Sequence, residues 1–69
     1  MPDRLSNRLK ERRAELGLTQ AELAERVGVT RKTVNTVENG IFTPSTILAL
    51  KLAEALDRSV EQLFQIIED

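Results

Sequence analysis

A chain of 69 residues, 41% of them hydrophobic and 30% charged, has the composition of one small globular domain rather than of a disordered tail. It contains no cysteine and no histidine, so disulfide bonds are excluded and the commonest zinc ligands and catalytic base are missing; no catalytic residue, metal site or cofactor is therefore expected. The formal net charge is −1, and the chain lacks both a membrane-length apolar run and an apolar leader, so a cytoplasmic protein is the expectation.

The first predicted helix starts at Asp3 or Leu5 and ends at Leu16. Leu5, Leu9 and Leu16 fall on one stripe of such a helix, and Gly17, which follows, is a typical C-terminal stop. The apolar stripe is expected to form one side of the core.

A second helix is predicted to start at residues 19–22, which read TQAE and match a capping box. Leu23, Ala24 and Val27 then follow at a spacing that puts them on one helical face. Gly28 interrupts this pattern, as expected where the backbone turns sharply or another helix lies close.

A third helix is predicted directly after this glycine. Thr30 is the expected N-cap, because its hydroxyl can accept a hydrogen bond from an amide of the first turn. Val34 and Val37 define the buried side. Two helices this short must pack on each other across the turn, and the small side chain of Ala24 leaves room for a close crossing. Residues 20–39 therefore predict a helix-turn-helix.

The outward side of this third helix carries cations, amides and hydroxyls. At about 100° per residue, the outward residues are Lys32, Asn35, Thr36 and Asn39, with Arg31 and Thr33 beside them. These groups can donate to phosphate oxygens and to base edges in a major groove. An ordinary solvated surface is the alternative, but such surfaces usually mix charge signs, and this one carries no carboxylate before Glu38. The pattern favours DNA binding.

A loop at residues 41–44 is predicted to follow Asn39 and Gly40. Ile41 and Phe42 are large apolar groups for an exposed loop. The simplest interpretation of Phe42 is that it packs into the core.

Two further helices are predicted after this loop. Ser45 is expected to cap a helix that ends near Leu56 and whose apolar residues cover more than one face, which indicates a second contact surface. Residues 59–62 match another capping box and open a final helix. The expected core residues of that helix are Val60, Leu63 and Phe64.

Four isoleucine and leucine residues are candidates for a contact between two copies of the chain. Ile47 and Leu50 belong to the apolar surplus of the fourth helix, and Ile66 and Ile67 lie beside the acidic C-terminus. Large apolar side chains are costly to leave in water. They predict a homodimer.

Charge is divided unevenly along the chain. Residues 1–37 carry eight cations against five anions, a net charge of +3, whereas residues 38–69 carry two cations against six anions, a net charge of −4. Because the local field rather than the total charge guides docking, this division predicts a DNA-facing side and an acidic rear.

The run LGLTQAELAERVGVTRKTVNTVENG resembles the phage repressor and Cro type of helix-turn-helix transcription regulators, and the similarity extends over about residues 5–65. The Gly-Leu-Thr-Gln start, the Leu-Ala pair, the Gly-Val turn and the Glu-Asn-Gly end are specific in combination. The resemblance implies an all-α fold of five short helices, a lambda-repressor-like bundle spanning residues 1–69. It also implies a sequence-specific, repressor-like regulator that binds a pseudo-palindromic site in double-stranded DNA as a homodimer.

The same resemblance implies roles for individual residues, with residues 31–39 as the recognition helix in the major groove. The positions that face base edges are Arg31, Lys32, Thr33 and Thr36, with Asn35 alongside, and the positions that contact the DNA backbone are Gln20 and Asn39. For Gln20, simple solvent exposure near a helix cap is an equal alternative. At positions 41 and 42 the chain departs from the family pattern, so no DNA contact is assigned there.

Two arginines of the first helix call for an explanation, because Arg12 lies within the apolar stripe and Arg13 beside it. The stem of Arg12 is expected to cover the core while its head reaches water. Glu38 points inward from the third helix, and a partly buried carboxylate needs a cation. The family resemblance implies that Arg13 supplies that cation.

The main alternative function is a protein-interaction module, such as an adaptor or an antitoxin-like protein, which the acidic rear and the apolar surplus would also suit. RNA binding is less favoured, because the chain has only two Phe and no Tyr or Trp for stacking on bases. Enzyme activity has the least support, since no catalytic constellation is present.

Overall fold

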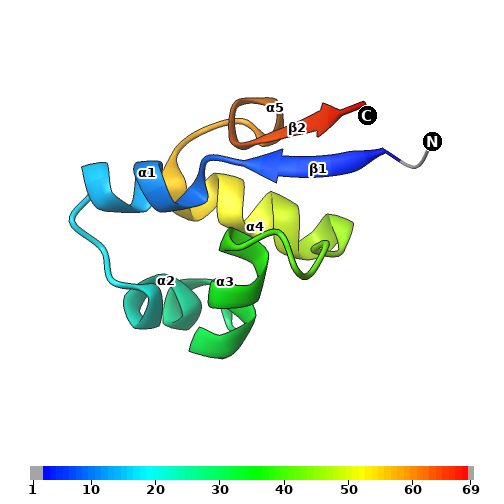
Figure 1. The fold of residues 1–69 in the computed structure, drawn as a ribbon. Coiled ribbons are helices and arrows are strands. Elements are labelled where there is room, and N and C mark those ends of the chain that lie inside the picture. Colours follow the sequence, from blue (N-terminus) through cyan, green and yellow to red (C-terminus); the bar gives the residue numbers. More distant parts are fainter. Residues whose placement is uncertain (1–2, 69) are drawn as a thin grey trace.

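The computed structural model describes residues 3–68 and shows five helices and one two-stranded antiparallel sheet (Figure 1). In chain order the elements are β1 (Arg4–Asn7), α1 (Leu9–Glu15), α2 (Gln20–Val27), α3 (Arg31–Glu38), α4 (Thr46–Leu56), α5 (Val60–Leu63) and β2 (Phe64–Ile67). The helices α2 and α3 lie together on one side of α4, and the β1–β2 pair lies on the other (Figure 1). Among residues 3–68, no helix has the length and apolar character needed to cross a membrane.

The polar residues predicted to start helices are confirmed as caps. Thr19 Oγ1 accepts a hydrogen bond from the Glu22 amide at 3.0 Å, and the Glu22 carboxylate accepts one from the Thr19 amide at 2.9 Å, which completes the capping box. Thr30 caps α3 by accepting from an amide of its first turn at 3.2 Å. Ser45 and Ser59 cap α4 and α5 in the same way.

The turn between α2 and α3 has the predicted geometry. Gly28 lies at φ 74°, in the left-handed region that favours glycine. Its amide and that of Val29 donate to the carbonyls of Glu25 and Ala24 at 3.3 and 3.0 Å, which closes the end of α2. This compact turn lets the two short helices pack against each other.

The prediction of an all-α fold is wrong at both ends of the chain, although the helix-turn-helix bundle between them fits. Strand β1 replaces the first turn of the predicted first helix, and β2 replaces the end of the predicted last one. Leu5 pairs with Ile66, and Asn7 pairs with Phe64. A two-stranded sheet is marginal alone; this one is held because Phe64 is buried and Leu5 packs against the core.

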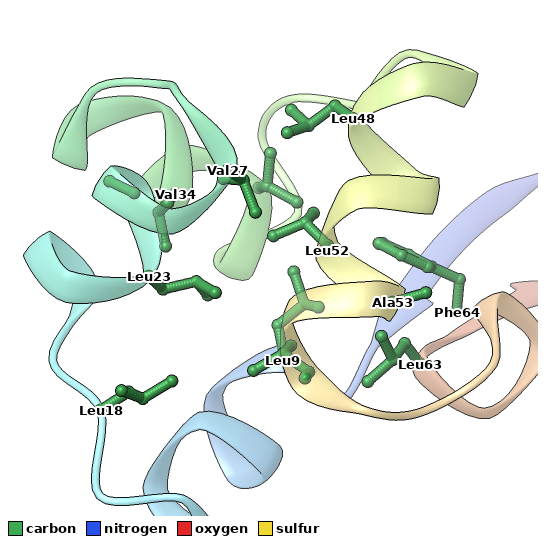
Figure 2. Packing of buried hydrophobic residues seen from close by; sticks show 13 residues of the cluster. Leu9, Leu18, Leu23, Val27, Val34, Leu48, Leu52, Ala53, Leu63 and Phe64 are labelled. Carbon is green, nitrogen blue, oxygen red and sulfur yellow. The ribbon is translucent and has the colours of Figure 1, made fainter.

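The core is built mainly from leucines, which come from α1, α2, α4 and α5 (Figure 2). The leucines that are at most 1% exposed are Leu9, Leu23, Leu52, Leu56 and Leu63. Val34 and Val37 are each 2% exposed, which confirms the predicted buried side of the third helix. Because both valines lie on one side of α3, the opposite side of the helix is exposed to solvent.

Two apolar predictions are wrong. Leu16 is 40% exposed, because it is the C-cap of α1, beyond the last helical residue, and the chain leaves the helix there at the predicted Gly17 stop. Phe42 is 48% exposed and lies outside the core.

Arg12 has a more definite role than the predicted snorkelling. Its Nε donates to the carbonyl oxygen of Leu56 at 2.8 Å, at the C-terminal end of α4, and its Nη1 lies 3.3 Å from the carboxylate of Glu15. A cation at this end of a helix donates to a terminal carbonyl and interacts favourably with the negative end of the helix dipole. Arg12 therefore ties α1 to the end of α4.

Candidate nucleic-acid interface

The side chains predicted to read DNA lie on the side of α3 away from its buried valines. Arg31, Lys32 and Asn35 are exposed, and Thr33 and Thr36 are half-buried. Helix α3 carries no acidic residue in its first turn, so Arg31 and Lys32 dominate the charge at that end. The surface therefore combines two flexible cations with shorter polar groups farther along the helix.

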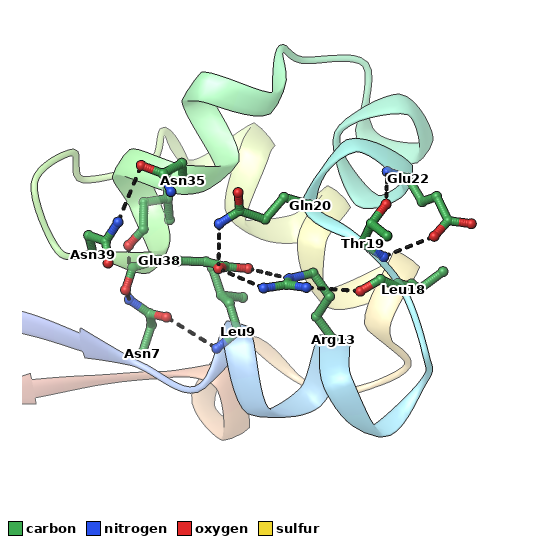
Figure 3. Close-up of polar contacts among 11 residues, drawn as sticks. Asn7, Leu9, Arg13, Leu18, Thr19, Gln20, Glu22, Asn35, Glu38 and Asn39 are labelled. Carbon is green, nitrogen blue, oxygen red and sulfur yellow. Dashed lines mark hydrogen bonds and ion pairs between the residues drawn. The ribbon is translucent and has the colours of Figure 1, made fainter.

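Hydrogen bonds within the protein determine which donors and acceptors the shorter polar side chains of this surface can present to DNA. Thr36 Oγ1 donates to the backbone carbonyl of Thr33 at 3.0 Å, which leaves its hydroxyl oxygen as an acceptor for a base amino group. The Thr33 hydroxyl shares a 3.0 Å hydrogen bond with that of Thr30. The Asn39 side-chain nitrogen donates to Asn35 Oδ1 at 3.3 Å, so these two amides are oriented together (Figure 3).

Gln20 and Arg31 line one hollow of the surface, and Asn39 lines another. Gln20 and Arg31 line one shallow hollow of about 380 Å³ between the starts of α2 and α3. Asn39 lies at the opposite end of α3, where it lines a hollow of about 370 Å³ that also includes Phe42 and Ile67. Gln20 therefore lies near Arg31 and also contacts the Glu38 side chain, whereas Asn39 is the C-cap of α3.

Beneath this surface, the Glu38 side chain connects α3 to other parts of the fold (Figure 3). Its side chain is only 2% exposed, and its two carboxylate oxygens accept from Arg13 Nε at 2.7 Å and Arg13 Nη2 at 3.2 Å. Arg13 Nη1 also donates to the carbonyl of Leu18 at 2.9 Å. This two-point ion pair confirms the predicted partner of Glu38 and joins α1 to α3.

Gln20 joins Arg13 and Glu38 to form a cluster of three side chains. The sequence alone did not indicate that Gln20 belongs to it. Its Nε2 donates to Glu38 Oε1 at 3.0 Å, so the side chain is half-buried rather than simply solvated. A glutamine near a helix start carries no sequence signal for such a contact. Its contact with the DNA backbone stays a prediction.

The cluster keeps Glu38 ionised. Burial opposes ionisation, but hydrogen bonds from Arg13 and Gln20 and the charges of Arg13 and Lys10 outweigh it, so the pKa of Glu38 lies below its ordinary value. The hydrogen bond to Glu38 in turn raises the pKa of Arg13 above its ordinary value, against the effect of burial. The charged pair is therefore the stable form at neutral pH.

Asn7 is the second residue that sequence reasoning missed. Its Nδ2 donates to the backbone carbonyls of Val37 and Glu38 at 2.9 and 3.3 Å, at the end of α3. The sequence placed Asn7 inside a helix, where it would have faced its own neighbours. In the structure Asn7 instead ends β1, where it pairs with Phe64 and lies beside the end of α3.

Comparisons with known proteins agree with this geometry. A helix-turn-helix family model matches residues 9–63. An uncharacterized HTH-type transcriptional regulator of Methanothermobacter thermautotrophicus is 55% identical over 62 residues, which cover 88% of this chain and 90% of that protein. The restriction-modification controller protein C.AhdI of Aeromonas hydrophila has a similar structure, with a TM-score of 0.74, 41% identity, and coverage of 78% of this chain and 82% of that one. The biofilm master regulator SinR, solved in complex with DNA, has a TM-score of 0.70 at 34% identity, with coverage of 75% and 84%.

Proposed function

The chain belongs to the helix-turn-helix family of transcription regulators, as its resemblance to the phage repressor and Cro type predicted, and we propose that it binds a specific double-stranded DNA sequence through α3. The observation that carries this proposal is the exposed polar side of α3, with Arg31 and Lys32 at its first turn, on a helix anchored from below by the buried Glu38. The family relationship favours a regulator and gives no support to enzyme activity.

In the proposed complex, α3 lies in the major groove with its N-terminal end deepest. Arg31 and Lys32 reach base edges and the neighbouring phosphates, and the residues that contact bases farther along are Thr33, Asn35 and Thr36. Gln20, at the start of α2, and Asn39, the C-cap of α3, contact the DNA backbone and set the register. The acidic residues that follow the loop at residues 41–44 face away from the DNA, and the protein acts in the cytoplasm.

Selection of bound sequences from a random duplex pool tests the function directly. A regulator of this kind enriches one consensus, and its affinity falls as salt rises because each neutralised phosphate releases counterions. Enrichment of no sequence, together with binding that does not respond to salt, would favour the alternative of a protein-interaction module. The exposed Ile47 and Leu50 of α4 are the surface such a module would use.

We further propose that the protein binds its site as a two-fold homodimer. The exposed fractions of the four candidate side chains are 68% for Ile47, 57% for Leu50, 69% for Ile66 and 42% for Ile67. Large apolar side chains that are this exposed often mark contact sites. A two-fold pair would set its recognition helices about 34 Å apart, one turn of DNA, and would match a pseudo-palindromic operator.

Replacing Ile66 and Ile67 together by Asp is expected to give a monomer at micromolar concentration, because the interface would then have to bury two charges. Sedimentation of the free protein measures this. Ile41→Asp is the matched control, since Ile41 is 76% exposed in the loop before α4 and outside the proposed interface. A wild type that sediments as a monomer at high concentration would contradict the proposed dimer.

A further inference from the structure

Asn7, the last residue of β1, joins three elements through one half-buried side chain (Figure 3). Its Nδ2 donates to the carbonyl oxygen of Val37 at 2.9 Å and to that of Glu38 at 3.3 Å, both at the end of α3. Its Oδ1 accepts a hydrogen bond from the amide of Leu9 at 3.1 Å, at the start of α1. The sheet, the first helix and the recognition helix therefore meet at this amide.

The two donated bonds fall where a helix leaves carbonyl groups without intrahelical partners. The loop after α3 supplies part of what is needed, because the Gly40 amide donates to the Val37 carbonyl at 3.1 Å. Asn7 adds a second donor to that carbonyl and reaches the carbonyl of Glu38, the last residue of α3. The helix end is thereby fastened to a separate part of the chain rather than only to its own loop.

The last turn of α3 is held from three directions. Arg13 from α1 and Gln20 from the start of α2 hold the Glu38 carboxylate, while Asn7 from β1 holds the backbone of the same turn. The contacts to the carboxylate fix where the side chain lies. The contacts from Asn7 fix the end of the helix axis itself.

We propose that Asn7 is a positioning residue for DNA recognition, which sets the tilt of α3 in the groove from the β1–β2 sheet. This inference rests on the proposed function of α3. Hydrogen bonds to base edges need close distances and near-linear geometry, whereas long cations can still reach a phosphate after a small shift of the helix. Loosening the end of α3 therefore weakens recognition of the preferred sequence before it weakens general attraction to DNA.

Two substitutions separate this role from simple capping of α1. Asn7→Ser keeps a neutral acceptor that can bond to the Leu9 amide, but its side chain is too short to donate to α3. Asn7→Ala removes both functions. Ser6→Ala is the matched control in the same strand, because the Ser6 hydroxyl donates to the carbonyl of Gln65 at 3.4 Å and takes no part in the contact with α3.

The experiment measures affinity for a duplex selected by the wild type and for an unselected duplex of equal length, below the melting temperature of every variant. Asn7→Ser and Asn7→Ala are both expected to lower affinity for the selected duplex about three- to tenfold, the range for losing one neutral hydrogen bond. Affinity for the unselected duplex should be unchanged, because neither substitution alters charge. Amide hydrogen exchange at Gly40 should become faster in both variants, and Ser6→Ala should match the wild type in every measurement.

Three results would overturn the inference. If Asn7→Ser behaves as the wild type while Asn7→Ala does not, Asn7 only caps α1. If both variants bind the selected and unselected duplexes equally less well, the loss is one of general stability rather than of recognition. If the wild type distinguishes no duplex from another, the proposed function itself fails and the inference fails with it, a case that is identified before any variant is made.

Discussion

Arg13→Ala is expected to lower the free energy of unfolding by about 3–5 kcal/mol, because it leaves the carboxylate of Glu38 charged and without its cation. The Glu38 side chain is 2% exposed, so water cannot replace the arginine without a rearrangement of α3. Gln20 alone would remain to donate to the carboxylate from among the side chains that now bond to it. For a domain this small, such a loss is comparable with the whole stability, about 5 kcal/mol.

A double-mutant cycle in urea tests this expectation. Removing both charges with Arg13→Ala and Glu38→Ala should destabilise the protein less than removing Arg13 alone, because no buried charge is then left unpaired. Arg26→Ala, at an exposed arginine of α2, is the control and should change stability little. A coupling energy near zero between positions 13 and 38 would show that the pair does not stabilise the fold.

The same pair should make stability depend on pH in the acid range. The folded pKa of Glu38 is lowered, so its stabilising effect is present above the unfolded pKa of about 4.3 and is lost as pH falls through the folded value. The Arg13→Ala, Glu38→Ala double variant should lose less stability than the wild type over that acid range.

Arg31→Ala is expected to weaken binding to the preferred site by about 1–3 kcal/mol, or about 5- to 150-fold, if the arginine makes a two-point contact to guanine. It should also relax the base preference at one position in each half-site. A binding titration with the selected duplex and with single-base variants of it measures both effects.

Three further variants separate base reading from backbone contact. Asn39→Ala should weaken all sequences and leave the salt dependence nearly unchanged, because a neutral amide releases no counterion, with an added effect through Asn35, to which Asn39 donates a hydrogen bond. Gln20→Ala should likewise weaken all sequences and leave the salt dependence nearly unchanged, with an added loss of stability from its bond to Glu38. Lys51→Ala, at an exposed position of α4, should change neither affinity nor preference. If Arg31→Ala and Lys32→Ala leave affinity and base preference unchanged, α3 is not the recognition helix.

The middle of the fold could be predicted because its signals are local. Thr19, Gly28 and Thr30 mark helix ends within a few residues of the amides and carbonyls that they satisfy, and Val34 and Val37 follow the helical period. The terminal sheet could not be predicted, because its strands pair residues from the two ends of the chain, such as Leu5 with Ile66. The spacing of Leu5 and Leu9 fits a helix equally well, and nothing near them in the sequence indicates a strand partner.

In the candidate site, too, the features that depend on local sequence could be predicted, and those that depend on packing could not. The outward residues of α3 follow from its period, and the pairing of Arg13 with Glu38 follows from a family resemblance together with the inward direction of Glu38. The contacts made by Gln20 and Asn7 depend on how separate elements pack. Their amides suit many partners, so residue type alone does not select one.

The pairing of β1 with β2 also bears on how the chain folds. The helix-turn-helix can form from neighbours in sequence, whereas the sheet must bring together Ser6 and Gln65, which are 59 residues apart. Closing so long a loop costs conformational entropy and is rewarded only after the helices between have packed. The sheet is therefore expected to form after the helices have packed and to open before they separate. Each opening would release Asn7 from the end of α3, so the lifetime of the closed sheet would set how long α3 keeps the alignment proposed for DNA recognition.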